Sequence, residues 1–182
     1  HTEPIKIINI CRSSDMNYLN SLREIDIATD IMNNPNDNII KIYDVIRSDD
    51  VVYIVMEYCS DGDLSSLLIK PLKENIAKYY FNQMVLGVKY IQQNKIIHRD
   101  IKPGNIMLTN NKKILRLTDF GLAKIHDNMK RTNTICGSPL YMAPELLNSL
   151  AYGEDVDVWA LGIILYEMLF GIHPFKDCKD YE

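Results

Sequence analysis

The segment HRDIKPGN, His98 to Asn105, and the DFG segment that follows it at Asp119 to Gly121 organise the rest of the chain. They supply two acids, a lysine and an amide close together. Such groups suit phosphoryl transfer, in which an Asp and an Asn hold metal ions while a second Asp accepts a hydroxyl proton. Each motif alone arises by chance, and a loop Asp is commonly only a turn former. Both motifs in this order favour a catalytic interpretation built on Asp100, Asn105 and Asp119.

These two motifs resemble those of the eukaryotic-type protein kinases, whose catalytic loop reads H-R-D-x-K-P-x-N and whose metal loop reads D-F-G. The resemblance implies an α+β, bilobal fold, with a small antiparallel β N-lobe that carries one helix and a mainly α-helical C-lobe. It places a partial N-lobe at residues 1–57, a hinge at 58–62 and a partial C-lobe at 63–182. It also implies ATP and Mg²⁺ as cofactors, with Asn105 and Asp119 as metal ligands. Lys102, two places after Asp100, is typical of the kinases that phosphorylate serine and threonine in proteins.

Length and composition set broad limits on the protein. A chain of 182 residues with 47% hydrophobic and 24% charged residues can bury one sizeable core. A net charge of −4, with basic residues scattered along the chain, gives no footprint for nucleic acid. The longest apolar run, 159–172, is too short to span a bilayer. A reducing, cytoplasmic compartment is expected because the four cysteines are far apart and form no C-x-x-C pair: Cys11, Cys59, Cys136 and Cys178.

The first forty residues predict a strand over 3–10 and an amphipathic helix over 16–32. The helix has apolar residues at Leu19, Leu22, Ile25 and Ile31. Lys6 in the strand and Glu24 in the helix would each, taken alone, be ordinary surface residues. The kinase resemblance instead implies that Lys6 pairs with Glu24 and holds the α- and β-phosphates of ATP.

Two further strands are predicted over 39–46 and 51–57, joined by a turn. The resemblance implies that Met56 lies at the back of the adenine pocket. It also implies that Glu57, Tyr58 and Cys59 form a hinge whose backbone binds the base. Asp63 has two interpretations that stay open, a ribose contact or the N-cap of a short helix over 64–69.

Two long helices are predicted in the C-terminal part. The first, over 73–94, turns one stripe inward, consisting of Ile76, Tyr80, Met84, Val88 and Ile91. The second, over 155–170, is apolar on nearly every face and is expected in the middle of the larger lobe. Asp157 is then a partly buried acid, and the resemblance implies that it bonds the backbone of the catalytic loop.

The segment from Asp119 to Glu145 ends TICGSPLYMAPE, which resembles the activation segment of kinases and, in its wording, that of the autophagy-initiating kinases. The resemblance implies phosphorylation at Thr134, with Thr132 as the second choice, by an upstream kinase or by autophosphorylation. It gives Arg99 a regulatory contact to that phosphate, Ser138 a place near Asp100 and Lys102, and Leu140 a place beside the substrate residue that follows the phosphate acceptor.

The chain also departs from the kinase pattern. No glycine-rich G-x-G-x-x-G-x-V precedes Lys6, and residue 182 comes before the last helices that the resemblance implies. We therefore expect the fragment alone to be a weak or inactive catalyst. Two alternatives stay open: a pseudokinase or scaffold that keeps the fold for partner binding, and a phosphotransferase for small molecules, against which the APE segment argues.

Overall fold

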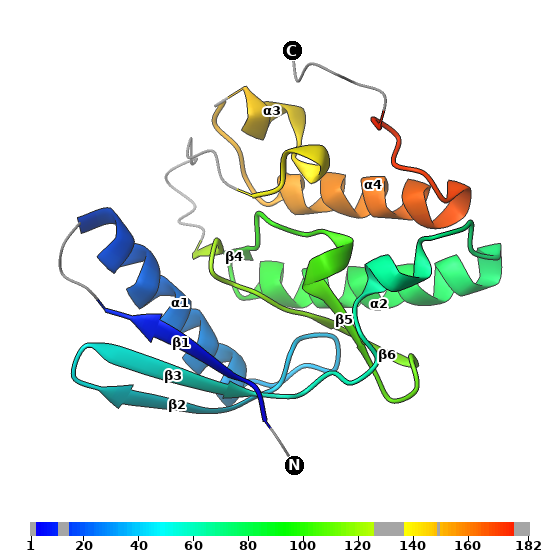
Figure 1. Ribbon diagram of the computed structural model, residues 1–182. Helices are drawn as coiled ribbons and strands as arrows, with labels where there is room; N and C mark the ends of the chain where they lie inside the picture. Colours follow the sequence, from blue (N-terminus) through cyan, green and yellow to red (C-terminus); the bar gives the residue numbers. More distant parts are fainter. Residues whose placement is uncertain (1–2, 11–14, 126–136, 149, 177–182) are drawn as a thin grey trace.

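The computed structural model describes residues 3–10, 15–125, 137–148 and 150–176 (Figure 1). The N-terminal part contains three strands and one helix: β1 (Ile5–Asn9), α1 (Asp15–Asn33), β2 (Ile42–Ser48) and β3 (Val51–Met56). The side chains of residues 15–17 lie outside what is described. This part confirms the predicted order strand, helix, strand, strand.

The three strands form one antiparallel sheet in the order β1-β3-β2. Lys6 is opposite Ile54, and Ile8 is opposite Val52. Because strand side chains alternate between faces, Lys6, Ile8, Val52 and Ile54 share one face. Ile8, Val52 and Ile54 form a small core with Ile25 and Ala28 of α1. Burial of this apolar face against α1 therefore directs Lys6 toward the same helix, at the place where Glu24 lies.

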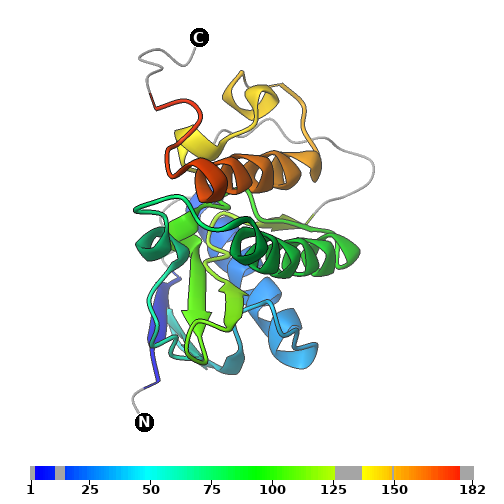
Figure 2. The same cartoon turned by 90° about the vertical axis from the view of Figure 1, so that its right-hand side faces the viewer.

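The C-terminal part is mainly helical, with short strands between the helices. Its elements, in chain order, are η1 (Leu64–Leu67), α2 (Glu74–Gln93), β4 (Ile96–Ile97), η2 (Pro103–Asn105), β5 (Ile106–Thr109), β6 (Ile114–Leu117), β7 (Lys124–Ile125), η3 (Pro139–Tyr141), α3 (Pro144–Leu147) and α4 (Asp155–Phe170). The long helices α2 and α4 lie side by side in both views (Figures 1 and 2). The predicted α+β architecture is confirmed.

Helix α2 corrects one residue of the predicted inward stripe. Tyr80, Met84, Val88 and Ile91 are buried as predicted, whereas Ile76 is 41% exposed. Ala77 is buried in its place, since it lies three residues before Tyr80 and seven before Met84, on the same side of the helix. In α1, similarly, Ile25 and Ile31 are buried while Leu19 is 45% exposed.

Helix α4 has the predicted bounds, but its apolar surface is not buried all round. Val158 and Phe170 are 53% and 56% exposed in the described part of the chain, whereas other sides of the helix pack against α2 and against the segment of η3 and α3. The helix ends at Gly171, whose φ of 68° is left-handed. A Cβ at this position would lie 2.6 Å from Cδ of Pro71. Glycine is therefore required both for the helix end and for the approach of the loop.

The antiparallel hairpin of β5 and β6 carries two of the predicted site residues at its open end. Asn105 directly precedes β5, and Asp119 follows β6 after Thr118, whose N–H donates to the carbonyl of Asn105 at 3.0 Å. One hairpin thus sets the positions of both side chains. None of the described helices is both long and apolar enough to cross a membrane.

Candidate active site

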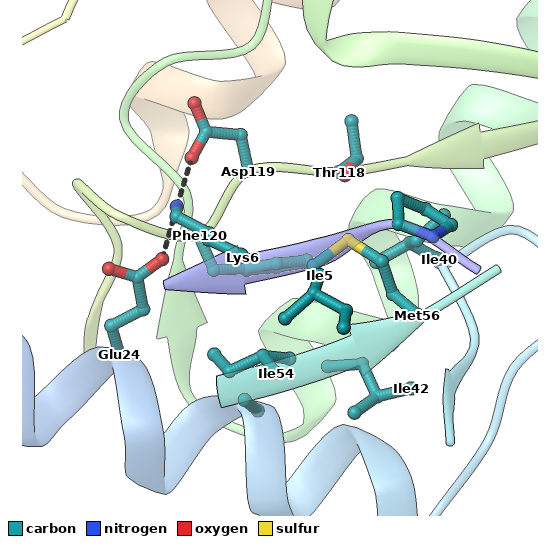
Figure 3. Close-up of a pocket in the computed structure, with 12 residues that line it drawn as sticks. Ile5, Lys6, Glu24, Ile40, Ile42, Ile54, Met56, Thr118, Asp119 and Phe120 are labelled. Atoms are coloured by element: carbon teal, nitrogen blue, oxygen red, sulfur yellow. Dashed lines mark hydrogen bonds and ion pairs between the residues drawn. The ribbon is translucent and has the colours of Figure 1, made fainter. Parts of the chain in front are cut away.

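Lys6, Glu24 and Asp119 come from three separate segments and meet at one point. Nζ of Lys6 donates to Oδ1 of Asp119 at 2.9 Å and forms an ion pair with Oε1 of Glu24 (Figure 3). The Glu24 side chain is 13% exposed and that of Asp119 is 48% exposed. The ammonium group is therefore anchored on the buried side by α1 and reaches the more open Asp119.

The charges of this group follow from its contacts. Burial alone would lower the pKa of Lys6, but the hydrogen bonds and charges of Glu24 and Asp119 outweigh burial and raise it. Burial alone would raise the pKa of Asp119, but Lys6 and the Gly121 backbone N–H outweigh it and lower the pKa. At neutral pH the lysine is therefore charged and Asp119 is a carboxylate.

A cavity of about 320 Å³ opens beside this cluster. Figure 3 shows Lys6, Glu24 and Asp119 at one side and apolar side chains of the sheet, including Ile5, Ile54 and Met56, along the remainder. A mostly apolar cavity with a few charged groups converging on one end is typical of a small-molecule site. The lining suits a ligand that has an apolar part and a charged part.

A second cluster surrounds the buried carboxylate of Asp100. Lys102 donates to its Oδ2 at 2.8 Å, and the amide of Asn105 donates to the same oxygen at 2.9 Å. The hydroxyl of Ser138 donates to Oδ1 at 2.9 Å and accepts from Lys102 at 2.7 Å. The structure thus brings Ser138 beside Asp100 and Lys102, as the sequence predicts, and Asp100 holds a hydroxyl in hydrogen-bonding geometry.

The segment with Ser138 fits against the catalytic loop closely. Gly137 has a φ of 109°, and a Cβ there would lie 2.3 Å from the carbonyl oxygen of Arg99. Only glycine permits this approach. Further along, the hydroxyl of Tyr141 donates to Oε2 of Glu167 in α4 at 2.9 Å. Both ends of this segment are therefore fixed to the core.

Asp157 of α4 holds the catalytic loop by hydrogen bonds to its backbone, as the resemblance implies. It is 1% exposed, and its two oxygens accept from the backbone N–H groups of His98 at 2.8 Å and Arg99 at 2.9 Å. Burial raises the pKa of Asp157, against the opposing effect of nearby charge and of these hydrogen bonds. Arg99 has a left-handed φ of 69° and Asp119 one of 64°. Such conformations persist only where surrounding contacts enforce them.

His98 is a site-supporting residue that the sequence motif contains but does not explain. It is fully buried, and its Nε2 lies 3.0 Å from the carbonyl oxygen of Thr118. Its Nδ1 accepts from the N–H of Asp100 at 3.3 Å, and its ring contacts Phe120 at 5.0 Å between centroids. The tautomer with a proton on Nε2 and a lone pair on Nδ1 satisfies both contacts. His98 thereby joins the Asp100 loop to the segment that carries Asp119.

The predicted hinge lies directly after β3. Met56 lines the cavity, whereas Glu57, Cys59 and Asp63 do not. Within the described residues, the carbonyl of Glu57 and the N–H of Cys59 make no hydrogen bond to another protein group. Burial is the main cause that raises the pKa of the Cys59 thiol, to about 11, which keeps it protonated. Asp63 caps η1 by accepting from the N–H of Ser66 at 3.3 Å, which is the second of its two interpretations.

The regulatory candidates are only partly described. Thr132 and Thr134 lie outside the described residues. Arg99 donates from Nε to the carbonyl of Leu122 at 2.7 Å and from Nη1 to the hydroxyl of Tyr152 at 3.1 Å. Leu140, in η3, is 40% exposed. It therefore offers an apolar side chain next to Ser138.

Sequence reasoning missed Arg116 of β6, which is only 2% exposed. It pairs with Glu57 of the hinge, with 2.8 Å between Nε and Oε2. Its partners are 59 and 79 positions away in sequence. The sequence around an arginine in a short strand gives no indication of such a distant contact. A buried position for an arginine becomes recognisable only once the strands are placed.

The donor set at the open end of the β5–β6 hairpin fits Mg²⁺. Asp119 supplies a carboxylate and Asn105 an amide oxygen, and Mg²⁺ prefers oxygen ligands. No group of three His, Cys, Asp or Glu side chains suited to a metal occurs among the described residues. Mg²⁺ in nucleotide sites uses one or two protein ligands and completes its shell with phosphates and water.

Comparison with known proteins gives a consistent result. Residues 3–182 match the protein kinase domain family. The chain is 40% identical over 177 residues to "Serine/threonine-protein kinase atg1" of Dictyostelium discoideum, covering 92% of this chain and 26% of that protein. It is 38% identical over 180 residues to "SNF1-related protein kinase catalytic subunit alpha KIN12" of Arabidopsis thaliana, covering 97% and 36%. It is 39% identical over 164 residues to "NUAK family SNF1-like kinase 1" of Mus musculus, covering 88% and 24%. The chain spans well under half the length of these relatives.

Proposed function

Because this chain belongs to the protein kinase domain family, we propose that the protein transfers the γ-phosphoryl group of ATP to serine and threonine hydroxyls of proteins. The observation that carries the proposal is the contact of a hydroxyl, that of Ser138, with Asp100 at 2.9 Å and Lys102 at 2.7 Å. A phosphate-accepting hydroxyl needs the same two partners, a base for its proton and a cation for the phosphoryl group.

The nucleotide phosphates are held by the first cluster. Lys6, oriented by Glu24, binds the α- and β-phosphates, and Asp119 with Asn105 binds Mg²⁺. When bound, Mg²⁺ neutralises charge on the β- and γ-phosphate oxygens. The contact between Lys6 and Asp119 at 2.9 Å supports this assignment, because it brings the proposed phosphate-binding cation and the proposed metal-binding carboxylate together beside the same cavity. The lowered pKa of Asp119 supports its role as an ionised ligand.

Asp100 is the base of the reaction. The oxygen of the substrate hydroxyl attacks the γ-phosphorus, the bond to the β-phosphate oxygen breaks, and the hydroxyl proton passes to Asp100. Lys102 stabilises the charge on the transferred group, and ADP leaves. Asn105 supports Asp100 by donating to its backbone carbonyl and to its Oδ2, both at 2.9 Å. Oδ1 accepts from the Ser138 hydroxyl at 2.9 Å, and the acceptor hydroxyl of a substrate takes the place of that contact or shares it.

The adenine of ATP is bound at the hinge by the Glu57 carbonyl and the Cys59 N–H, with Met56 behind it. Asp63 contacts the ribose in addition to capping η1. The lobe division at 1–57, 58–62 and 63–182 follows from this assignment. The Glu57 carbonyl and the Cys59 N–H, which bond no other protein group within the described residues, support it. The widely spaced cysteines support a reducing, cytoplasmic setting.

Protein substrates bind beside Ser138 and Leu140. Leu140 contacts the substrate residue that follows the phosphate acceptor. Phosphorylation of Thr134, or secondarily Thr132, by an upstream kinase or by the protein itself brings a phosphate to Arg99. The exposure of Leu140 and the close packing of Gly137 on the catalytic loop support this placement.

The test is phosphate transfer by the full-length protein and its Asp100→Asn variant, with Asp26→Asn as a control at an exposed position of α1. Labelled ATP and a mixed library of serine and threonine peptides serve as substrates. We expect transfer by the wild type and the control, and a loss of about a hundredfold or more in Asp100→Asn. Equal activity of the three proteins would refute the proposal. A folded wild type that binds ATP without transfer would favour the scaffold alternative.

A further inference from the structure

Arg116 connects the hinge, through Glu57, to β6, the strand that leads to Asp119. It belongs to β6, three residues before Asp119, and is paired in register with Met107 of β5. The neighbouring segments are the hinge after β3 and the loop between α1 and β2 (Figure 1). A charged side chain that is 2% exposed here requires partners.

Arg116 finds one partner in each of these segments. Its Nε lies 2.8 Å from Oε2 of Glu57, and its Nη2 donates to Oε1 at 3.4 Å. Its Nη1 donates to the backbone carbonyl of Asp37 and lies 3.8 Å from Oδ1 of the same residue. The Glu57 side chain is 15% exposed, whereas that of Asp37 is 94% exposed. Arg116, Asp37 and Glu57 are called the Arg116 clamp below.

The strongest member of the clamp is the pair with Glu57, because both side chains are largely removed from water. Neither Nε nor Oε2 has an aligned hydrogen bond despite the short distance. The contact is therefore an ion pair held by charge. Such a pair is strongly sensitive to removal of one partner, since the other is left as an uncompensated charge.

Backbone contacts extend the clamp on the same side of β6. The N–H of Leu117 donates to the carbonyl of Asn38 at 2.8 Å, and the N–H of Ile40 donates to the carbonyl of Leu117 at 2.9 Å. The N–H of Glu57 donates to the carbonyl of Lys41 at 2.9 Å. The hinge, the loop and β6 are thereby joined through both backbone and side chain.

We propose that Arg116 is a positioning residue that sets the spacing between the hinge, which binds the base, and Asp119, which binds the metal and phosphates. This inference rests on the proposed function. A ligand that spans both ends gains most from a fixed spacing, because less freedom is lost when it binds. A ligand that touches only the hinge gains nothing from it. The clamp therefore acts on ATP and not on adenosine.

The experiment compares two affinities in the full-length protein and its Arg116→Met variant. Dissociation constants for Mg·ATP and for adenosine are measured by calorimetry, with adenosine as the probe of the hinge alone. We expect Mg·ATP to bind about tenfold more weakly in the variant, as for the coupling of residues in direct contact. We expect adenosine to bind within about twofold of the wild type, a change within the error of such couplings.

The controls separate positioning from general damage. Arg47→Met removes an exposed arginine of β2 and is expected to change neither affinity. Arg116→Lys keeps a charge for Glu57 and is expected to recover part of the Mg·ATP affinity. If Arg116→Met does not fold, the double variant Glu57→Gln/Arg116→Met leaves no buried charge unpaired, since Asp37 is 94% exposed, and is used in its place.

The outcomes decide between the two levels of inference. Equal weakening of both ligands, or no change in either, overturns the positioning role while the proposed function stands. A wild-type protein that binds neither ligand overturns the proposed function, and the clamp with it. A selective loss of Mg·ATP that Arg116→Lys partly restores supports the clamp.

Discussion

Asp157→Asn tests whether the catalytic loop is held in place by a single buried carboxylate. The substitution replaces one acceptor oxygen with an NH₂ group that faces the N–H of either His98 or Arg99, at the present 2.8 and 2.9 Å. One hydrogen bond to a charged acceptor is lost, at about 1.5–3 kcal/mol, and a buried N–H is left unsatisfied, at about 1–3 kcal/mol. Relief of the buried charge offsets part of this cost, because burial raises the pKa of Asp157.

The net expectation is a decrease of about 2–4 kcal/mol in the free energy of unfolding. Urea denaturation of the wild type and the variant measures it, and phosphate transfer measured below the transition shows whether the loop still works. Asp155→Asn is the matched control, since Asp155 is exposed in the first turn of the same helix. If the free energy of unfolding of Asp157→Asn lies within about 0.5 kcal/mol of that of this control, the carboxylate does not hold the loop and the reasoning is wrong.

Three further outcomes are expected. Ser138→Ala lowers kcat about tenfold with an unchanged KM for ATP, because a hydrogen bond to each charged partner is lost, and Ser138→Thr restores most of it in steady-state assays. Gly171→Ala lowers the free energy of unfolding by about 2–4 kcal/mol, because of its positive φ and the contact with Pro71, whereas Gly162→Ala, with open space around it, does not; chemical denaturation measures both. Ionised Asp119 adds to the free energy of unfolding relative to Asp119→Asn. This difference is full from neutral pH down to the ordinary pKa of 3.8 and is lost as the pH falls through the lowered pKa, as denaturation at a series of pH values would show. A difference between the two proteins that grows below pH 3.8 would contradict the lowered pKa.

Local sequence signals predicted the elements whose cause is local. Helix α4 has the predicted bounds because a mainly apolar run ends at Gly171, whose left-handed φ of 68° favours glycine and ends the helix. The inward stripe of α2 was wrong at Ile76, because the packed side of a helix depends on its neighbour and not on hydrophobicity alone. The predicted burial of α4 on all faces is likewise not seen in the described part of the chain, since only packing partners decide it.

The site residues also differ in how far the sequence predicted them. Motif spacing and the kinase resemblance led to Lys6, Glu24 and Asp119, which the structure brings together. The contacts of His98 and the burial of Arg116 were not predicted, because each depends on segments distant in sequence. A single sequence contains the residues for such contacts but not the distances that make them.

Helix α4 sets the spacing between the catalytic loop and the segment that carries Ser138. Asp157 near its start holds the loop with Asp100, and Glu167 near its end holds Tyr141 beside the Ser138 segment. Ten residues separate them, about 15 Å along the axis at 1.5 Å per residue. Inserting or deleting one residue between them would turn one anchor by about 100° relative to the other. The length of this helix is therefore constrained by geometry, even at positions that touch nothing in the site.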